Sequence, residues 1–508
     1  MSNSGRIAKN TFYLYIRSLF VLFISLYTSR VVLRELGVVD YGIFNIVGGV
    51  IGMLAFLNSN MRTTYLRYFN VEMGQGNDAG VKSLFHSALA VQLILAAIIV
   101  VLAESVGLWF VENKLVIPAE RMDAAFWVYQ SAIASFLLTI FSAPFGAAIT
   151  AYERMGAFAV ISIIDAVLKL GIVLLLPYIP HDKLITYALL MLLISLLNIF
   201  FYFYYCKKRL PIITVALNWN KENLRSMFSF SGWSIMDLLS YTLISQGINI
   251  VLNLFFGPVV NAARGISYQV HNAVNQFIHS FQISFRPQLT KSYASGDYDY
   301  MKQLFFSGTK ISYYLIFTLS LPIILETPYI LHLWLGENVP DYTVVFTRLV
   351  LLTAFVSAFA NPTSGVVYAT GRIKWFSIIV SGLNLMIIPI AYLFLWLGYG
   401  PVSAFVVCFV MAILVQLTRI IVTSRLTVIS LSDYFLHVIM PTGTYSLLTP
   451  WMAYAVVCLI PQGIGRLALT CVLSVISSFL LVWLIGLNRQ EKRLALSKLK
   501  PLNANRRH

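Results

Sequence analysis

Polar and ionisable side chains recur along residues 261–286 at spacings of three and four, in a chain that is otherwise strongly apolar. At about 100° per residue, these spacings place them on one narrow stripe of a single helix. The stripe consists of Arg264, Tyr268, His271, Asn275, His279, Gln282 and Arg286, and Asn261, Asn272 and Gln276 widen it. Because an arginine at the bilayer centre costs at least about 2.5 to 3.5 kcal/mol, this face is expected to line an aqueous cavity. The alternative is a helix buried between neighbours, with its amides bonded to other helices.

Further ionisable residues lie in apolar segments and are candidates for gating or ion coupling. Arg17 and Asp237 lie 220 positions apart, and as an ion pair they would latch one gate; separate helix-packing contacts are the alternative. Asp165 and Lys169 are four residues apart and therefore close enough to neutralise each other on one helix. Local pairing is the favoured interpretation of these two, and proton or cation coupling is the alternative.

The elements that must position these residues are membrane helices. The chain has 508 residues, of which 59% are hydrophobic and 11% charged, and its mean hydropathy is +0.79. A span needs about 20 apolar residues, and continuous apolar runs of that length exclude the alternating pattern of a β-barrel. The fold class is thus all-α and polytopic, with about fourteen predicted spans: 10–33, 40–60, 83–104, 122–148, 155–177, 184–205, 228–256, 258–287, 303–325, 342–368, 373–397, 400–424, 435–460 and 465–487.

An internal repeat predicts two pseudo-symmetric lobes. Gly37 and Gly76 recur as Gly257 and Gly296, a shift of 220, and Pro144 recurs as Pro362. Each copy holds about six helices, so the copies are related by an axis along the membrane normal, as in transporters with parallel repeats. The expected parts are an N-lobe (1–206), a cytoplasmic linker (207–227), a C-lobe (228–426), a C-terminal helix pair (427–488) and a basic cytoplasmic tail (489–508).

Basic residues orient the chain. With the N-terminus in the cytoplasm, most of the 36 Lys and Arg residues fall on the cytoplasmic side, as the positive-inside rule requires. The net charge of +16 therefore needs no nucleic acid as partner. The linker and the tail are expected to lie on an anionic leaflet. The prediction is a multi-pass membrane protein with both termini in the cytoplasm.

Enzymatic and metal chemistry find little support. The four cysteines show no metal-ligand spacing, no phosphate-binding loop of the ATPase type is present, and Asp297 and Asp299 imitate a D-x-D motif in a short loop. No cofactor, metal site or catalytic residue is expected. A membrane sugar transferase or polymerase is accordingly the weakest alternative.

The segments "LGVVDYGIFNIV", "NAARGISYQVHNAV" and "KSYASGDYDYMKQLF", together with the two six-helix lobes, carry a resemblance to a known family. The chain resembles the Wzx-type polysaccharide flippases of the multidrug/oligosaccharidyl-lipid/polysaccharide exporter superfamily, over nearly its whole length. The resemblance implies transfer of an undecaprenyl-diphosphate-linked oligosaccharide from the cytoplasmic to the periplasmic leaflet by alternating access, for surface polysaccharides such as O-antigen. The expected partners are this glycan, membrane lipids, H⁺ or Na⁺ as counter-ion, and a polysaccharide polymerase.

A flippase of this kind would use the polar stripe as its substrate site. A diphosphate requires cations and several donors, which arginine provides in a planar fork. Arg17, Arg264 and Arg286 are therefore predicted to contact the diphosphate. The sugar or water is assigned to the other stripe residues, Tyr268, His271, Asn275, Gln276 and Gln282, and ion coupling to Asp237, Asp165 and Lys169. A drug/cation antiporter of the same superfamily is the rival, and it would present carboxylates in place of this cationic face.

Overall fold

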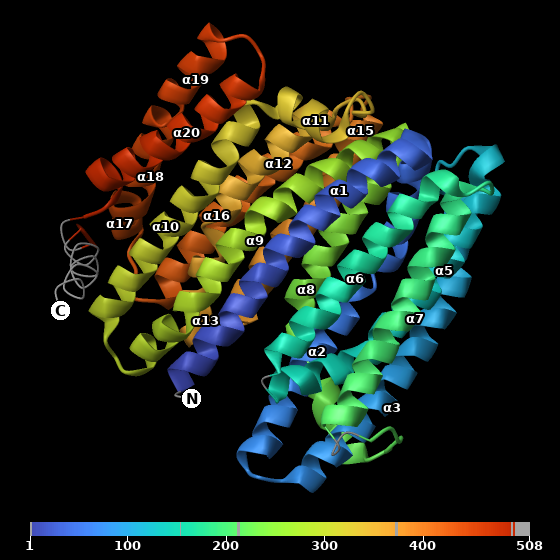
Figure 1. The fold of residues 1–508 in the computed structure, drawn as a ribbon. Helices are drawn as coiled ribbons and strands as arrows, with labels where there is room; N and C mark the ends of the chain where they lie inside the picture. The colour runs from blue at the N-terminus through green and yellow to red at the C-terminus, as the bar shows by residue number, and fades with distance from the viewer. Residues whose placement is uncertain (1–2, 153, 211–213, 371–373, 489–490, 493–508) are drawn as a thin grey trace, which may run out of the picture. The chain divides into compact units, whose positions relative to one another are not determined.

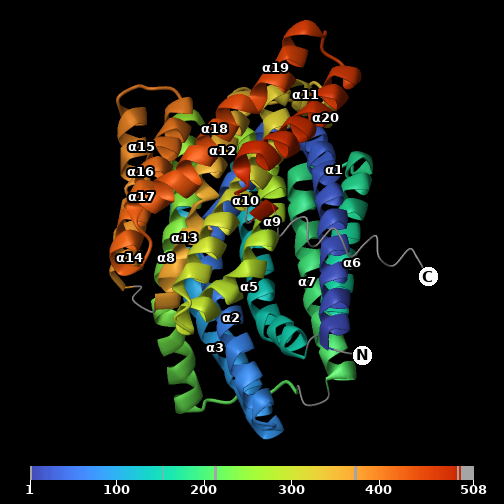
Figure 2. The same ribbon diagram turned by 90° about the vertical axis from the view of Figure 1, so that its left-hand side faces the viewer.

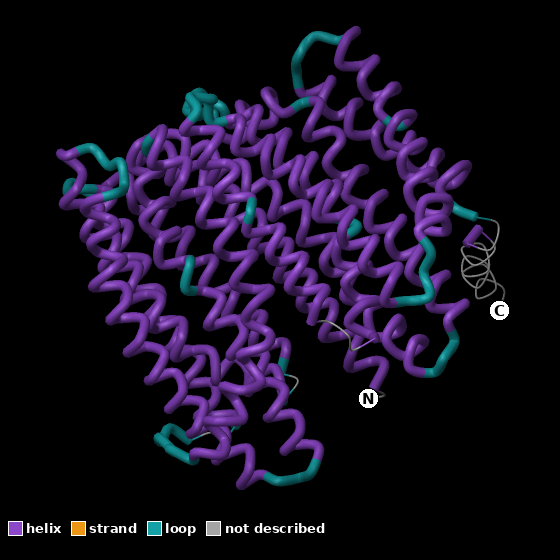
Figure 3. The backbone as a smooth tube through the Cα atoms, turned by 180° about the vertical axis from the view of Figure 1, so that it is seen from behind, coloured by secondary structure: helices purple, strands orange, loops and turns teal. Residues whose placement is uncertain are grey.

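The computed structural model of the chain describes residues 3–152, 154–210, 214–370, 374–488 and 491–492. Figure 3 shows helices joined by short loops, and none of these residues forms a strand. Ten helical stretches among them are long and apolar enough to cross a membrane. The predicted all-helical, polytopic class is confirmed.

The helices divide between two compact units. Unit 1 comprises Met1–Gly265 with Glu337–Asp341, and unit 2 comprises Ile266–Gly336 with Tyr342–His508. Unit 1 contains α1 (Asn3–Gly52), α2 (Ala55–Gly74), α3 (Asp78–Leu102), η1 (Ala103–Gly107), α4 (Leu108–Asn113), η2 (Ala119–Arg121), α5 (Met122–Ala151), α6 (Met155–Leu175), η3 (Leu176–Tyr178), α7 (Lys183–Arg209), α8 (Lys221–Phe256) and the first turns of α9 (Pro258–Ala294). Unit 2 contains the rest of α9, α10 (Tyr298–Leu325), α11 (Thr327–Leu335), α12 (Thr343–Ser357), α13 (Ala360–Thr370), α14 (Lys374–Leu385), α15 (Ile387–Trp396), α16 (Val402–Leu426), α17 (Leu431–Tyr434), η4 (Phe435–Ile439), α18 (Met440–Leu448), α19 (Pro450–Leu459), α20 (Ile464–Leu481) and η5 (Val482–Gly486).

The unit boundary and the predicted lobe boundary differ. The sequence repeat divides the chain at the linker 207–227, whereas contacts divide it inside α9. The difference arises because α8, the first helix of the second repeat, packs against α1, α2 and α3. The lobes are thus defined by the sequence repeat, and the units by the contacts between helices.

The backbone repeats where the sequence does. Gly37 interrupts α1 with φ 78° and ψ 171°, and Gly257 separates α8 from α9 with φ 72° and ψ −169°. Positive φ is favourable only without a Cβ, so glycine is required at both positions. Gly76 and Gly296 also share positive φ, at 69° and 76°. The next residues, Asn77 and Asp297, cap the following helices by accepting a bond from the backbone amide three residues later.

Helix ends depart from the predicted spans. α2 continues to Gly74 and α9 to Ala294, and α8 begins at Lys221. A hydropathy window detects the apolar stretch alone, whereas polar residues extend a helix as readily. The predicted spans 342–368, 373–397 and 435–460 are each divided into shorter helices.

Proline explains part of this division. Pro362 stands in the first turn of α13, directly after the break that follows α12, and there its missing N–H costs nothing. Pro144 occupies the related position in the first repeat, yet α5 continues through it as one helix. The two repeats differ in this respect.

Unit 1 is built around two apolar clusters. One surrounds Ile43, Ile46 and Tyr129 close to the end where Gly37 and Gly257 lie, which we call the Gly37 end. The other surrounds Phe85 and Phe145 close to the ends of α2 and α7, which we call the linker end. α5 packs along α7 between the two ends, and α3 packs against α5 (Figure 1).

In unit 2 the C-terminal helices dock on α10. α20 packs against α10 (Figure 2). The buried residues include Gly308, Ser312 and Ser320 on α10 and Ser474, Ser477 and Ser478 on α20. Small residues let membrane helices approach closely. Two buried ion pairs close the contact, Glu326–Arg466 at 2.7 Å and Lys310–Glu491 at 2.9 Å.

Glu491 is a carboxylate buried just beyond the last membrane helix. Burial disfavours its charge, but bonds from Ser307, the Asn488 amide and Lys310 outweigh the burial and hold its pKa below the ordinary value. Asn488 and Glu491 also bond to each other's backbone amides, at 2.7 and 2.8 Å. This reciprocal capping box fixes the chain where it leaves η5.

Candidate functional site

The predicted stripe on α9 begins with residues buried against α8. The Asn261 amide donates to the backbone oxygen of Asn249 at 2.7 Å and to its side-chain oxygen at 2.8 Å. The Arg264 guanidinium, 6% exposed, donates to the backbone carbonyl of Ser245. This first part of the stripe is therefore engaged in helix packing within unit 1.

The remainder of the stripe lies in unit 2 and is heterogeneous. Nε2 of His271 lies 2.6 Å from the amide nitrogen of Asn275. The ring centres of His271 and Tyr268 are 5.7 Å apart. Gln282 is buried, and it donates to the carbonyl of Ala358 at 3.2 Å while it accepts from Asn361 at 2.7 Å.

The middle of α9 has its polar side chains least covered. Asn272 and His279 are exposed, and Gln276 is half-buried. Interhelical bonding thus applies at Asn261, Arg264 and Gln282, whereas an aqueous cavity along the other stripe residues stays a prediction. Arg17, Asp237 and Arg286 lie outside the residues whose side chains the structure describes, and their assigned roles stay predictions.

Asp165 and Lys169 form the expected local pair on α6, at 2.7 Å. Asn198 of α7 donates to the other oxygen of Asp165 at 2.5 Å. Both carboxylate oxygens are therefore occupied within unit 1. Whether the pair couples ions stays a prediction.

A buried amide network joins the two predicted lobes at the Gly37 end. Asn253 of α8 is fully buried, and its side chain pairs both backbone groups of Val116: it accepts from the N–H at 2.8 Å and donates to the C=O at 3.3 Å. Asn253 also donates to Asn261 at 3.0 Å, and Asn249 donates to the Asn45 carbonyl at 3.4 Å.

Glycine permits this close approach. A Cβ on Gly42 of α1 would lie 1.9 Å from the carbonyl oxygen of Pro258, the first residue of α9. No side chain fits there without separating the helices. The amide network and this contact together seal α1 against the α8–α9 corner within unit 1.

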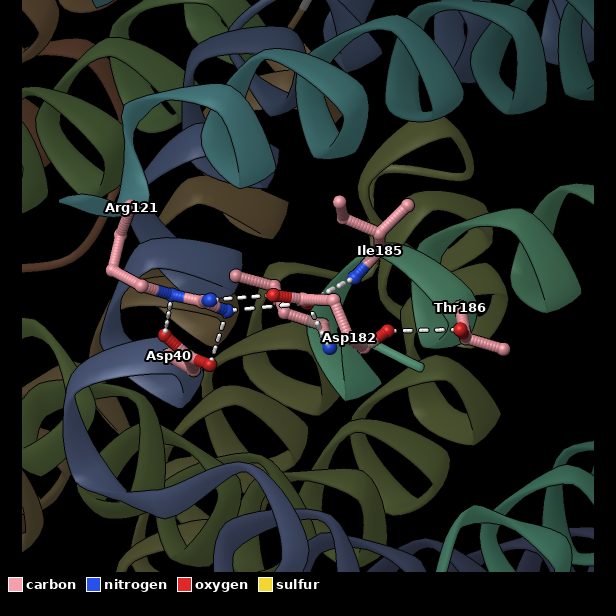
Figure 4. A network of polar contacts seen from close by, with 6 residues as sticks. Asp40, Arg121, Asp182, Ile185 and Thr186 are labelled. Carbon is pink, nitrogen blue, oxygen red and sulfur yellow. Dashed lines mark hydrogen bonds and ion pairs between the residues drawn. The ribbon is translucent and has the colours of Figure 1, made fainter. Parts of the chain in front are cut away.

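An ion cluster holds the loop that carries Val116. Arg121, five residues on, donates from Nε and Nη2 to Asp40 at 2.8 and 2.6 Å, and from Nη1 to Asp182 at 2.5 Å (Figure 4). Asp182 also caps α7 by accepting from the backbone amides of Leu184 and Ile185. One guanidinium therefore fixes the Gly37 ends of α1, α5 and α7 relative to one another.

The charge of Asp182 is favoured chiefly by its bond from Arg121, and the pKa of this carboxyl lies below the usual 3.8. A carboxyl with a lowered pKa stabilises the fold above its unfolded pKa, and the contribution is lost as pH falls through the folded value. We expect Asp182→Asn to lower the unfolding free energy by at most about 1 kcal/mol at pH 7, since the pair is partly exposed. The difference from the native protein should vanish in unfolding curves below the folded pKa. Asp123→Asn, at an exposed aspartate of α5, should have no effect at any pH.

Arg62 on α2 is a candidate that sequence reasoning missed. It is half-buried, its guanidinium lies 5.0 Å from the Phe158 ring centre, and no described carboxylate pairs with it. It stands 12 residues from Gly74, or about 18 Å along the helix. The shift of 220 aligns Arg62 with Gln282, so the repeat would have identified it.

Metal ligands do not gather in this site. Among the residues that the structure describes, no three His, Cys, Asp or Glu side chains are placed to hold a metal ion.

Comparisons with known proteins show the fold of the chain. The profile of the family described as MatE matches residues 234–393. An inward-facing multidrug resistance MATE family transporter of the MOP superfamily superposes with TM-score 0.66 and 14% identity, over 81% of this chain and 97% of that one. The chain has the MATE fold. Lipid II flippase MurJ in an inward closed conformation shares this fold with TM-score 0.64 and 12% identity, over 93% of this chain and 98% of that one.

A curated relative is similar over part of the sequence. The uncharacterized membrane protein EpsK of Bacillus subtilis (strain 168) is 20% identical over 278 residues, which are 54% of this chain. The match spans about half the length of that relative, 55%. It adds a third membrane protein to the comparison without assigning an activity.

Proposed function

We propose that this protein is a flippase of the MOP superfamily that moves an undecaprenyl-diphosphate-linked oligosaccharide across the bacterial inner membrane by alternating access. The linker end of unit 1 then faces the cytoplasm and the Gly37 end the periplasm. A sugar head group cannot cross hydrocarbon unaided, since each unpaired hydroxyl costs about 4 to 8 kcal/mol there. The polar residues of the helices would replace the lost hydrogen bonds while the lipid tail stays in the bilayer.

The extent of the structural match carries this proposal over a drug antiporter. The lipid II flippase covers 93% of the chain and the inward-facing MATE transporter 81%, a difference of about 61 of 508 residues. That is about the length of the predicted C-terminal pair, 427–488. The helices that dock on α10 thus favour kinship with a lipid flippase.

Charge supports the same choice. Among the residues whose side chains the structure describes, six carboxylates pair with Lys or Arg: Glu35, Asp40, Asp165, Asp182, Glu326 and Glu491. A cation antiporter needs carboxylates that are free for its cargo, whereas these are neutralised. Arg62, in contrast, has an aromatic ring beside it and no described anion, which suits a diphosphate. In this proposal Arg62 is a diphosphate contact. Arg17 and Arg286 stay predicted contacts, whereas Arg264 is committed to the Ser245 carbonyl.

Proteoliposomes that carry a fluorescent undecaprenyl-diphosphate-linked oligosaccharide test the proposal, with transfer measured by quenching from outside. The native protein should speed transfer, and Arg62→Gln should slow it about tenfold, since one charge-assisted contact contributes about 1.5 kcal/mol. Arg62→Lys should retain more activity. Arg425→Gln, which removes an exposed arginine from the end of α16, is the matched control. Uptake of an organic cation without transfer of the lipid would instead establish the antiporter.

A further inference from the structure

The extended segment 214–219 between α7 and α8 is fastened to the protein at alternate positions. The Thr214 hydroxyl lies 2.9 Å from Nε2 of His86, and the Asn218 amide donates to the Ser83 hydroxyl at 3.1 Å. The backbone amide of Asn218 also donates to the His86 carbonyl, at 3.5 Å. In an extended chain, alternate side chains point to opposite sides, so one edge of the segment is committed to α3.

The opposite edge is apolar and uncovered. Val215, Leu217 and Trp219 are 59%, 54% and 52% exposed. Exposing apolar surface to water costs about 25 cal/mol per Å². These three large apolar side chains lie in register and form a contiguous patch of the kind that marks an interaction site. We call these three side chains the linker edge.

Cations flank the linker edge. Lys207, Lys208 and Arg209 occupy the last turn of α7, and Lys221 opens α8, all of them exposed. Glu222 is the acidic neighbour, in the first turn of α8. The surroundings are thus net positive, which favours an anionic occupant.

The length of α7 places this surface at a leaflet. Its 27 residues extend about 40 Å, close to the 40–45 Å of a bilayer with its head groups. The ammonium of Lys207 lies 5.9 Å from the Phe203 ring and that of Lys208 lies 5.6 Å from the Tyr204 ring. Aromatic rings with cations beside them are typical of the membrane–water interface.

We propose that the linker edge binds the head-group region of anionic phospholipid, with Val215, Leu217 and Trp219 inserted between acyl chains and Lys207, Lys208, Arg209 and Lys221 paired with lipid phosphates. The surface is independent of the proposed cargo. It would hold the connection between the two repeats at a fixed depth, while Thr214 and Asn218 keep it fastened to α3.

Spin labels test the proposal in the full-length protein with its four native cysteines replaced. Single cysteines at Val215, Ala216 and Leu217 are labelled in nanodiscs of pure phosphatidylcholine or with 40% phosphatidylglycerol. Collisions with oxygen should exceed those with a nickel chelate at 215 and 217 and not at 216, and phosphatidylglycerol should strengthen the contrast. Equal access of the nickel chelate at all three sites would overturn the proposal, and so would exclusion of both reagents at 215 and 217, which would indicate a protein partner.

A charge pair supplies the matched control. Lys207→Gln/Lys208→Gln should remove most of the response to phosphatidylglycerol, whereas Lys374→Gln/Arg425→Gln, the same change in exposed residues of unit 2, should leave it intact. Equal loss in both variants would mean that the response reports overall charge, and the proposed surface would be wrong.

Discussion

Replacing Glu326 with alanine is expected to lower the unfolding free energy by about 3–5 kcal/mol, the cost of leaving a buried charge without its partner. Glu326 is 1% exposed and accepts from Arg466 at 2.7 Å and from Thr470 at 3.3 Å. Arg466 would keep only its weaker bonds to the carbonyls of Val457 and Ile460. Unfolding in detergent, followed by the reactivity of newly exposed cysteines, measures the change.

The double variant Glu326→Ala/Arg466→Met separates charge from packing. It should be more stable than Glu326→Ala alone, because no unpaired charge remains buried. Lys183→Met is the control at a partly exposed pair, where Lys183 is 34% exposed and lies 3.0 Å from Glu35. It should cost less than about 1 kcal/mol. Equal losses in Glu326→Ala and in the double variant would show that the pair contributes through packing alone.

Continuous apolar runs predicted the helices well, because burial in the membrane requires about 20 apolar residues in each span. Helices occupy all fourteen predicted spans among the described residues. Gly37 and Gly257 were recognisable because positive φ restricts the choice of residue, and the structure gives them matching backbone angles. The breaks within spans were missed, because the hydropathy of a segment does not indicate where its intrahelical hydrogen bonds are interrupted.

The candidate site was harder to predict, because a polar helix face is compatible both with a water-filled cavity and with hydrogen bonds to neighbouring helices. The helical spacing of the stripe indicates only which side chains point in the same direction. In the structure Asn261, Arg264 and Gln282 form hydrogen bonds to neighbouring helices. The bonds of Asn253 to the backbone of Val116 join residues 137 positions apart. No pattern in the sequence identifies that contact, because one partner is backbone alone.

The loop from Lys114 to Pro118 links two polar features of unit 1. Val116 is held from one side by Asn253, and Arg121 is held from the other by Asp40 and Asp182. The ion cluster belongs entirely to the first repeat, whereas Asn253 belongs to the second. Any movement between the repeats at the Gly37 end must therefore break the Asn253 contact, while the ion cluster is free to move as one body.

Asn253→Leu is expected to open the Gly37 end, because leucine fills a similar volume and pairs neither backbone group of Val116. Asn261 is fully buried, and its side-chain oxygen loses the donor that Asn253 supplies, which costs about 1–3 kcal/mol. Because Val116 is 46% exposed, water can replace its two lost bonds. The population should therefore shift about fivefold or more toward a state in which water reaches the end of α8. Spin labels at Lys114→Cys and Val259→Cys, in the cysteine-free protein, report the separation of loop and α9 by pulsed electron resonance. The distance distribution should lengthen and broaden.

Asn198→Leu makes the same chemical change at an asparagine of α7 bonded to Asp165, far from the loop along the chain, and should leave that distribution as in the native protein. An unchanged distribution in folded Asn253→Leu would mean that the Gly42–Pro258 contact holds the helices by itself. A lengthened distribution combined with slower lipid transfer would mean that closure is a step of the cycle. A transporter that rests open at one end needs additional free energy to close that end. In that case asparagine suits position 253 because its side-chain amide forms hydrogen bonds of the same kind and strength as a peptide group. The contact with Val116 can therefore form completely and can still open.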